Sequence, residues 1–378
     1  MKDVLEGALH YLESRRDSSL VNALAAPLVP LSWCYGLALS LRWSLEEFRS
    51  KLAVPCTVVS VGNMTVGGTG KTPMVAWVAQ FFHRMGVRTA VVSHGYGART
   101  SGSYVLLREQ DPSPRVSSVA GDEAVLLSHL LGSVPVASGW TKASAVRRTW
   151  RALRPQVIVL DDGFQSISIR KDLEIVLVDA TNPWGSGHLL PRGRLREPKQ
   201  NLSRGDVVVI TRCNQVQNTQ ALESEIRRLT RAPIVRGEHV LRGVWKVDSW
   251  EEAKPEVLEK AAVYAFSGVA NPESFEQTLR ETGVRLVGSK RFSDHHFFSA
   301  HDLEAIREEA SHVKTEFLVT TEKDAMRLPV EGEMPRLGIP LLAVGIELRT
   351  AEGTEALQRA LLSALETGPK PRREGRVR

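Results

Sequence analysis

The segment that most constrains the fold is a glycine-rich loop at residues 65–72. A β-branched run at residues 58–61 precedes it, a helix-like stretch at 74–85 follows it, and residues 89–92 again resemble a strand. Strand, loop, helix and strand in this order predict a βαβ unit with a phosphate-binding P-loop. The loop consists of Thr65, Val66, Gly67, Gly68, Thr69, Gly70, Lys71 and Thr72.

The residue types in this loop suit a triphosphate. Glycines let consecutive backbone amides point at phosphates, and the N-terminus of the following helix adds positive charge. Lys71 can reach the β- and γ-phosphates, and Thr72 can bind Mg²⁺. Thr65 stands where the strict pattern has glycine, and a simple glycine-rich turn is the alternative interpretation. The Lys-Thr pair at the helix start favours a nucleotide site.

Two acids follow a strand-like run further along the chain. Apolar runs at 157–160, 175–178 and 207–210 have the length of strands buried on both faces of a parallel sheet. Asp161 and Asp162 follow the first run, at the carboxyl end where ligands bind in open α/β sheets. In P-loop enzymes an acid here holds Mg²⁺, although DDG alone is often only a turn. With the loop upstream, we interpret the pair as a Mg²⁺ site.

The N-terminal part has a long uncharged run at residues 18–41, which two prolines interrupt. Trp33, Tyr35 and Trp43 are aromatics typical of the membrane interface. We therefore favour an interfacial helix over a buried core helix, and either of these over a single membrane span. No cleavage site typical of a signal peptide follows the run.

Composition narrows the class of partner. A net charge of +6 suits an anionic partner, and the basic residues at 370–378 are more simply a solvated terminus than a lipid or nucleic-acid contact. Cys34, Cys56 and Cys213 are far apart and form no CxxC pair, so neither a disulfide framework nor a zinc site is indicated. Three widely spaced cysteines without a disulfide framework suit a protein that works in the reducing cytoplasm.

A second alternating region begins near residue 263, with strand-like runs at 317–320 and 341–344. We expect an α/β fold: a P-loop NTPase-type, mostly parallel sheet with helices on both faces, a second, smaller α/β domain, and an N-terminal membrane-associating helical segment. The expected division is an N-terminal segment at 1–50, a P-loop domain at 51–235, a C-terminal α/β domain at 236–368 and a basic tail at 369–378.

Several motifs together give the chain a family resemblance. In order along the sequence they resemble those of the tetraacyldisaccharide 4′-kinase (lipid A 4′-kinase) family. They are GNMTVGGTGKTP (62–73), GYG (95–97), GDE (121–123), DDGFQ (161–165), LREP (195–198), SGVANPESF (267–275), DHH (294–296) and TEKDA (321–325).

The resemblance implies an ATP-dependent kinase of lipid A biosynthesis. It would use Mg²⁺ and transfer the γ-phosphate of ATP to the 4′-hydroxyl of tetraacyldisaccharide 1-phosphate, an acylated glucosamine disaccharide lipid. It would work at the membrane surface, on the cytoplasmic face of the bacterial inner membrane, with no nucleic-acid partner. An interfacial N-terminal helix would bring the ATP site to such a lipid.

The resemblance also implies roles for single residues. Asp122 would be the base near the sugar hydroxyl, and His295 would assist it. Residues 65–72 would hold ATP, and the metal ligands would be Thr72, Asp161 and Asp162. Residues near the substrate would be Glu123, Arg196 and Glu197, with Arg196 contacting a phosphate of ATP or of the acceptor.

Plainer interpretations stand beside these roles. Asp122 and Glu123 also suit the first turn of a helix, and residues 322–324 are as consistent with a helix cap as with a ligand site. The chain departs from the family at His94, Ser166 and residues 191–194, which leaves the acyl pattern of the substrate open.

A P-loop switch or metal-insertion GTPase is the alternative function. Guanine recognition needs an NKxD-type element, and residues 211–214 lack its lysine and aspartate.

Overall fold

The computed structural model describes residues 27–47, 50–94, 104–107, 120–329 and 334–369. Three predicted features lie wholly or partly outside the described residues: the GYG motif at 95–97, residues 18–26 of the uncharged run, and the basic tail at 370–378.

A single 13-stranded sheet forms the centre of the molecule, in the order β11-β10-β12-β13-β8-β7-β6-β1-β5-β2-β4-β3, with β9 beside β8. Its strands are β1 (Thr57–Asn63), β2 (Thr89–His94), β3 (Val105–Leu107), β4 (Val136–Gly139), β5 (Val157–Asp161), β6 (Leu173–Asp179), β7 (Val207–Thr211), β8 (Ile234–Lys246), β9 (Glu252–Ala253), β10 (Ala262–Ser267), β11 (Arg285–Arg291), β12 (Phe317–Thr321) and β13 (Leu341–Glu352). Neighbouring strands run parallel, except that β8 is antiparallel to β13 and β9, and β3 to β4. The predicted mostly parallel sheet is confirmed.

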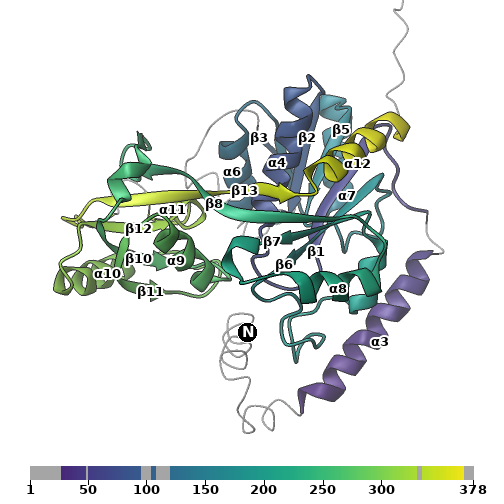
Figure 1. Cartoon of the computed structure of the whole chain (residues 1–378). Coiled ribbons are helices and arrows are strands. Elements are labelled where there is room, and N and C mark those ends of the chain that lie inside the picture. The colour runs from purple at the N-terminus through teal and green to yellow at the C-terminus, as the bar shows by residue number, and fades with distance from the viewer. Residues whose placement is uncertain (1–26, 48–49, 95–103, 108–119, 330–333, 370–378) are drawn as a thin grey trace, which may run out of the picture.

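Helices cover both faces of the sheet, as predicted (Figure 1). They are α3 (Leu28–Glu47), α4 (Lys71–Arg84), α6 (Asp122–Leu131), α7 (Lys142–Leu153), α8 (Gln220–Leu229), α9 (Pro272–Glu281), α10 (Ala300–His312), α11 (Glu322–Ala325) and α12 (Thr354–Thr367), with short 3-10 helices at Lys199–Arg204, Cys213–Gln215 and Pro255–Leu258. Helices α4, α6 and α12 share one core with β1 and β5, whereas α7 and α8 pack on the opposite face. Strands β1, β5 and β7 are buried along their whole length, which explains their continuous apolar sequences.

Strands β8 and β13 join the larger and the smaller part of the molecule. Figure 1 shows them running from the P-loop part to the part that contains β10, β11 and β12. In the smaller part, α10 packs on one face of the sheet and α9 on the other. The predicted domain boundary at residues 235–236 falls within β8, so both parts share one sheet. That the parts are separate domains stays a prediction.

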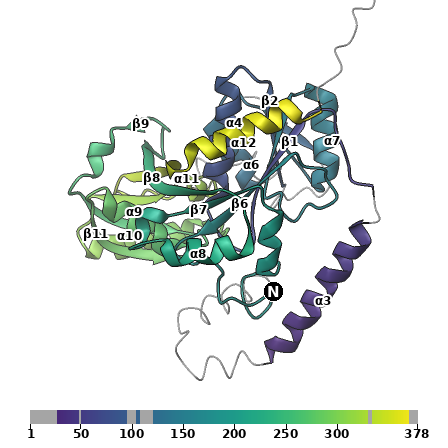
Figure 2. The ribbon, with the colours of Figure 1, turned by 45° about the vertical axis from the view of Figure 1, so that its right-hand side comes forward.

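Helix α3 lies at the edge of the molecule, beside the P-loop part (Figure 2). Its hydrophobic side chains are largely exposed: Leu31 55%, Trp33 73%, Leu37 64%, Leu41 59% and Leu45 62%. The alternative of a buried core helix is therefore wrong for this segment. No helix in the described part of the chain has the length and hydropathy of a membrane span.

Candidate active site

The glycine-rich loop connects the end of β1 to the start of α4, as predicted. Gly67 and Gly70 have φ angles of 115° and 86°, which side chains with a Cβ atom disfavour. Helix α4 begins at Lys71, so the amides of its first turn are available to an anion. A Cβ atom at Gly70 would lie 2.5 Å from Nε2 of His239. The loop therefore needs glycine here for its conformation and for space.

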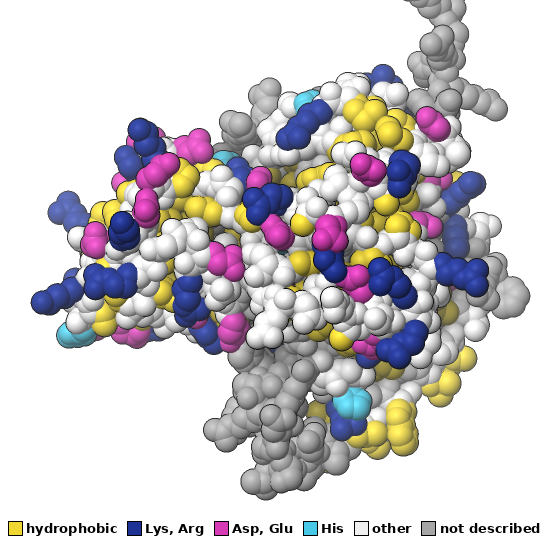
Figure 3. All heavy atoms as spheres, viewed as in Figure 1, with side chains coloured by type: hydrophobic (Ala, Val, Ile, Leu, Met, Phe, Trp, Pro, Cys, Tyr) yellow, Lys and Arg dark blue, Asp and Glu magenta, His cyan; other side chains and the backbone are white. Residues whose placement is uncertain are grey.

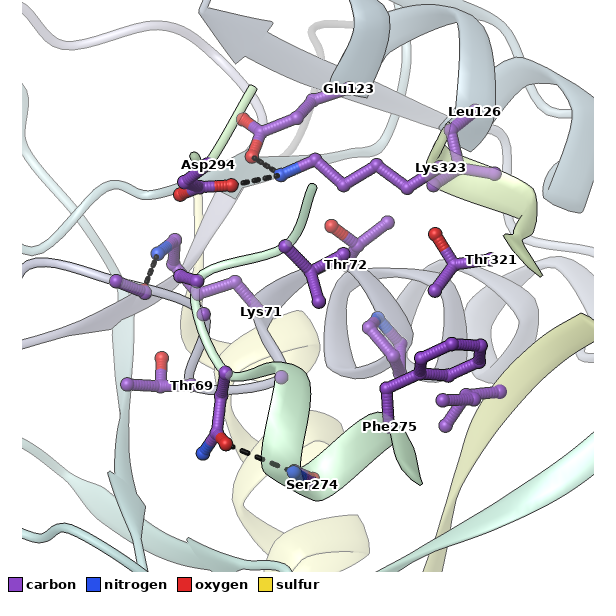
Figure 4. Close-up of a pocket in the computed structure, with 18 of the residues that line it drawn as sticks. Thr69, Lys71, Thr72, Glu123, Leu126, Ser274, Phe275, Asp294, Thr321 and Lys323 are labelled. Carbon is purple, nitrogen blue, oxygen red and sulfur yellow. Dashed lines mark hydrogen bonds and ion pairs between the residues drawn. The ribbon is translucent and has the colours of Figure 1, made fainter. Parts of the chain in front are cut away.

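A cavity of about 450 Å³ opens between this loop and the smaller part of the molecule (Figure 4). The P-loop residues 66–72 form one wall of it, and Lys71 Nζ lies 3.5 Å from the carbonyl oxygen of Gly67. One region of the lining is apolar, formed by Leu126, Leu130, Phe275, Val344 and Ile346. The other is charged, formed by Lys71, Glu123, Asp162, Arg196, Arg212, Asp294, His295 and Lys323. An apolar region beside a cationic loop suits a ligand with a flat ring and phosphates.

The two acids after β5 differ in environment. Asp161 is buried: its Oδ2 accepts a hydrogen bond from Ser93 at 2.7 Å, whereas its Oδ1 has no partner among the described residues. Burial, together with the nearby Glu123 carboxylate, raises the pKa of Asp161 to about 6. An unpaired buried oxygen of this kind suits a cation or a water bound to one.

Asp162 lines the cavity, has φ 50°, and binds cations from three segments. Its two oxygens accept hydrogen bonds from Arg196, both at 2.9 Å, and Lys71 Nζ lies 4.0 Å away. Lys142, at the start of α7, donates to its backbone carbonyl. Burial opposes ionisation, but the charges of Arg196, Lys71 and Lys142 hold the pKa of Asp162 well below its usual range.

The predicted metal ligands are compatible with Mg²⁺. Thr72 and Asp162 both line the cavity, and Asp161 lies at the end of the adjacent strand β5. Among the described residues, no three His, Cys, Asp or Glu side chains form a metal cluster. This does not count against Mg²⁺, which usually takes one or two carboxylates and completes its shell with phosphates and water.

Asp122 and His295, far apart in sequence, meet at the cavity. His295 Nδ1 lies 3.0 Å from Asp122 Oδ2, and His295 has φ 63°. The His295 side chain is 25% exposed and lines the cavity, whereas the Asp122 side chain is 5% exposed and lies behind it. Burial disfavours the charged carboxylate, yet the hydrogen bond from His295 and the Arg327 charge keep the pKa of Asp122 well below its usual range.

The other predicted site residues lie in different settings. Glu123 lines the cavity, and Lys323 Nζ sits between it and Asp294, at 3.6 Å and 3.9 Å (Figure 4). Arg196 lines the cavity beside Asp162. Glu197 is buried, and its carboxylate accepts hydrogen bonds from three side chains: Gln165, Asn201 and Arg204. The substrate roles of these residues stay predictions.

Three buried polar atoms of the cavity lining have no hydrogen-bond partner in the described part of the chain. They are Thr69 Oγ1, Arg212 Nε and His239 Nε2. Burial and the Arg212 charge lower the pKa of His239, so its ring is neutral. Because unpaired buried polar atoms are costly, their position next to the P-loop suggests that a polar ligand completes the site.

Four side chains at the site were not predicted: Lys142, Arg212, His239 and Arg327. A signal exists for two of them. Lys142 follows the N-cap residue Thr141 and is the first residue of a helix that comes after a strand. Lys71, which precedes Thr72, is likewise the first residue of α4. His239 shares the buried face of β8 with Val235, an unusual place for a polar residue. Arg327 lies just beyond the TEKDA motif, and no local pattern distinguishes it.

Comparisons with known proteins agree with this architecture. The family model described as tetraacyldisaccharide-1-P 4′-kinase matches residues 24–366. The tetraacyldisaccharide 4′-kinase of Geobacter metallireducens is 38% identical over 323 residues, covering 84% of this chain and 92% of the relative. That of Syntrophus aciditrophicus is 36% identical over 313 residues, covering 80% and 83%. A crystal structure of LpxK from Aquifex aeolicus in complex with ATP, 25% identical, covers 90% of this chain and 99% of its own with a TM-score of 0.68. The chain therefore belongs to the tetraacyldisaccharide-1-P 4′-kinase family.

Proposed function

We propose that the cavity between the P-loop and the smaller part is where this ATP-dependent lipid A 4′-kinase transfers the γ-phosphate of ATP to the 4′-hydroxyl of its acceptor. The observation that carries this assignment is the 3.0 Å contact between Asp122 and His295, beside the loop that ends in Lys71. Phosphoryl transfer to an alcohol requires a group that accepts the hydroxyl proton and a loop that binds the phosphates. The Asp–His pair and the P-loop supply these two parts at one cavity.

Residues 65–72 bind the triphosphate in this proposal. Backbone amides and the N-terminus of α4 hold the phosphates, and Lys71 neutralises charge at the β- and γ-positions. The unpaired atoms of Thr69, Arg212 and His239 are further candidates for nucleotide contacts. The Aquifex aeolicus relative was crystallised in complex with ATP, which supports the same donor here. Thr72, Asp161 and Asp162 would hold Mg²⁺, whose charge would offset that of the phosphates.

The Asp122–His295 pair receives the proton of the sugar hydroxyl. The sugar oxygen forms a bond to the γ-phosphorus while the bond between that phosphorus and the β–γ bridging oxygen breaks, and ADP leaves. Asp122 is the base in this proposal, as the resemblance implies, and His295, which faces the cavity, relays the proton to it across their 3.0 Å contact. Glu123 and Arg196 line the same cavity and are the proposed contacts to the acceptor. Glu197 pairs with Arg204, and its negative charge also favours the protonated form of the neighbouring Arg196 by raising the pKa of that guanidinium.

Helix α3 brings this site to the acceptor lipid at the membrane. Figure 3 shows hydrophobic side chains along this helix, in agreement with the exposure of Trp33, Leu37 and Leu41. Ser32 donates a hydrogen bond to the carbonyl of Leu189 at 2.9 Å, which ties the helix to the segment before Arg196. An exposed apolar helix with interfacial aromatics suits peripheral binding at the cytoplasmic face of the inner membrane.

A lipid kinase assay tests the proposal. Purified protein with ATP and Mg²⁺ is expected to phosphorylate tetraacyldisaccharide 1-phosphate in mixed micelles, with the product identified by thin-layer chromatography. Lys71→Ala should lower turnover by about 10²–10³-fold, since it removes a cation from the developing charge. Lys290→Ala, which removes a surface pair with Glu309, is the control and should retain activity. Asp122→Ala should lower turnover far more than ATP affinity. Absence of product from the folded wild-type protein would contradict the assignment.

A further inference from the structure

Two side chains at the end of β7 hold the P-loop by its backbone carbonyl oxygens. Thr211 Oγ1 donates a hydrogen bond to the carbonyl of Thr69 at 3.0 Å, and Arg212 Nη2 donates to the carbonyl of Gly68 at 2.7 Å. Both donors are buried, with exposures of 0% for Thr211 and 6% for Arg212. Strand β7 is separated from β1 by β6 in the sheet, so these contacts reach across a strand to the loop.

Arg212 is itself fixed by a buried anion. Its Nη1 pairs with one carboxylate oxygen of Asp179, the last residue of β6, whose side chain is 7% exposed. The other oxygen of Asp179 accepts hydrogen bonds from the amide and the hydroxyl of Thr181, at 3.0 Å and 2.7 Å. Arg212 also has φ 58°, a conformation that residues other than glycine rarely adopt. A buried guanidinium group with an anchored partner has little freedom, so its position fixes that of the Gly68 carbonyl.

These contacts determine which way two amides of the loop point. In a planar trans peptide group, the C=O of one residue and the N–H of the next point in opposite directions. Because the carbonyls of Gly68 and Thr69 point to the end of β7, the amides of Thr69 and Gly70 point away from it. Both residues line the cavity, and consecutive amides of such a loop are the groups that bind phosphates.

The composition of the loop explains why such a restraint is needed. Residues 67, 68 and 70 are glycines, and peptide groups next to glycine rotate more easily than those next to other residues. Without a restraint, part of the protein would have these amides turned away from the phosphates. The apparent affinity for a ligand falls in proportion to the fraction of molecules that can bind it.

We propose that Thr211 and Arg212 are positioning residues for ATP binding: by holding two carbonyls of the P-loop, they keep the amides of Thr69 and Gly70 oriented for the phosphates before ATP arrives. This inference rests on the proposed role of residues 65–72. Thr211 is fully buried behind the loop, so it acts through the loop rather than by touching ATP. The segment thus differs from the NKxD-type element of GTPases, which reads the base.

Binding of a non-hydrolysable ATP analogue and of inorganic triphosphate, each with Mg²⁺ and measured by calorimetry, tests this role. Thr211→Val removes the hydroxyl and keeps a methyl group at the place where Thr211 faces Gly70. Its affinity for both ligands should fall about fivefold, the usual effect of one neutral hydrogen bond. Its kcat at saturating ATP should stay within about twofold, because bound phosphates restore the loop. Thr211→Ser, which keeps the donor, should retain affinities within about twofold of the wild type.

A second variant and a control accompany the first. Arg212→Lys keeps a charge opposite Asp179 but loses the planar fork that also reaches Gly68, so both affinities should fall about tenfold. The control is Thr89→Val, which removes the hydroxyl of another buried threonine, bonded to the carbonyl of Val87 at 3.0 Å at the start of β2. This variant should bind both ligands as the wild type does.

Three results would overturn the inference. The first is a folded Thr211→Val or Arg212→Lys protein with wild-type affinities, and the second is an equal loss in the Val and Ser variants of Thr211. The third is a loss confined to the ATP analogue, with inorganic triphosphate bound normally, since this would place the segment at the nucleoside. A wild-type protein that binds neither ligand would contradict the proposed role of residues 65–72, and this inference with it.

Discussion

The hydroxyl of Tyr35 in α3 donates a hydrogen bond to the backbone carbonyl oxygen of Arg196 at 3.1 Å, across 161 residues of sequence. The guanidinium group of Arg196 in turn binds both carboxylate oxygens of Asp162 at 2.9 Å. The peripheral helix is thus joined to the acidic edge of the active site through one residue.

Tyr35→Phe should lower the free energy of unfolding by about 1 kcal/mol, because it removes this partly buried hydrogen bond and keeps the ring. Urea denaturation measures the change. Ser40→Ala is the matched control on the same helix, since its exposed hydroxyl bonds only to the carbonyl of Gly36 one turn earlier. Equal losses in the two variants would mean that the Tyr35 hydroxyl contributes nothing specific.

Asp122→Asn should destabilise the protein by roughly 1.5–3 kcal/mol at pH 7, because buried Arg327 would lose one of its two carboxylate partners and keep only Asp324. The pKa of Asp122 is lowered in the folded protein, so its stabilising effect is complete above about pH 4 and is lost as pH falls towards the folded value. The difference between wild type and variant should therefore narrow below pH 4. Urea denaturation from pH 3 to pH 8 tests this, with exposed Glu355→Gln as the control. A gap that does not change with pH would contradict the expectation.

Gly70→Ala should abolish ATP binding and lower the melting temperature. The φ of 86° alone costs a residue with a Cβ atom about 1–2 kcal/mol, and the methyl group would also collide with His239. Gly86→Ala separates the two effects, because Gly86 has φ 73° but nothing within 4 Å of the added carbon. Calorimetric titration with an ATP analogue should show loss of binding in the first variant only; binding by both would argue against the collision.

The exposed face of α3 should account for vesicle binding. Substituting both Leu37 and Leu41 with Glu removes apolar side chains that each contribute up to about 1.5–3 kcal/mol on burial, so partitioning into anionic vesicles should fall at least about tenfold. ATP affinity should not change. Met85→Glu makes the same kind of change at an exposed position after α4 and serves as the control. Unchanged sedimentation of the double variant with vesicles would remove α3 from the proposed membrane contact.

Local sequence patterns predicted the elements whose burial is regular. Strand β1, the loop and α4 were found because a valine-rich strand, glycines and a lysine follow one another within a short stretch of sequence; α4 begins at Lys71, earlier than the expected residue 74. Strand β11 was not predicted, since it lies at the sheet edge and is rich in charged and small residues such as Arg285, Gly288 and Lys290. An edge strand needs no apolar periodicity, and so leaves little signal.

The site was only partly predictable for a different reason. Asp122 and His295 were chosen through the family resemblance, because each residue alone suits an ordinary helix start or surface loop. Their contact depends on how α6 and the loop before α10 meet across the sheet, which no short pattern encodes. Arg327 was harder still to predict from the sequence, because a buried arginine is recognisable only when its two carboxylate partners are known.

The paired strands β8 and β13 carry a mechanical consequence. They connect the part of the molecule that contains the P-loop to the part that carries His295, and their pairing shifts register just after Gly345, opposite Gly243. A Cβ atom at Gly345 would lie 2.4 Å from Oε2 of Glu322, and one at Gly243 would lie 2.5 Å from the ring of Trp245. Larger residues at these two positions would therefore push the ribbon away from its neighbours and change how the two parts face each other.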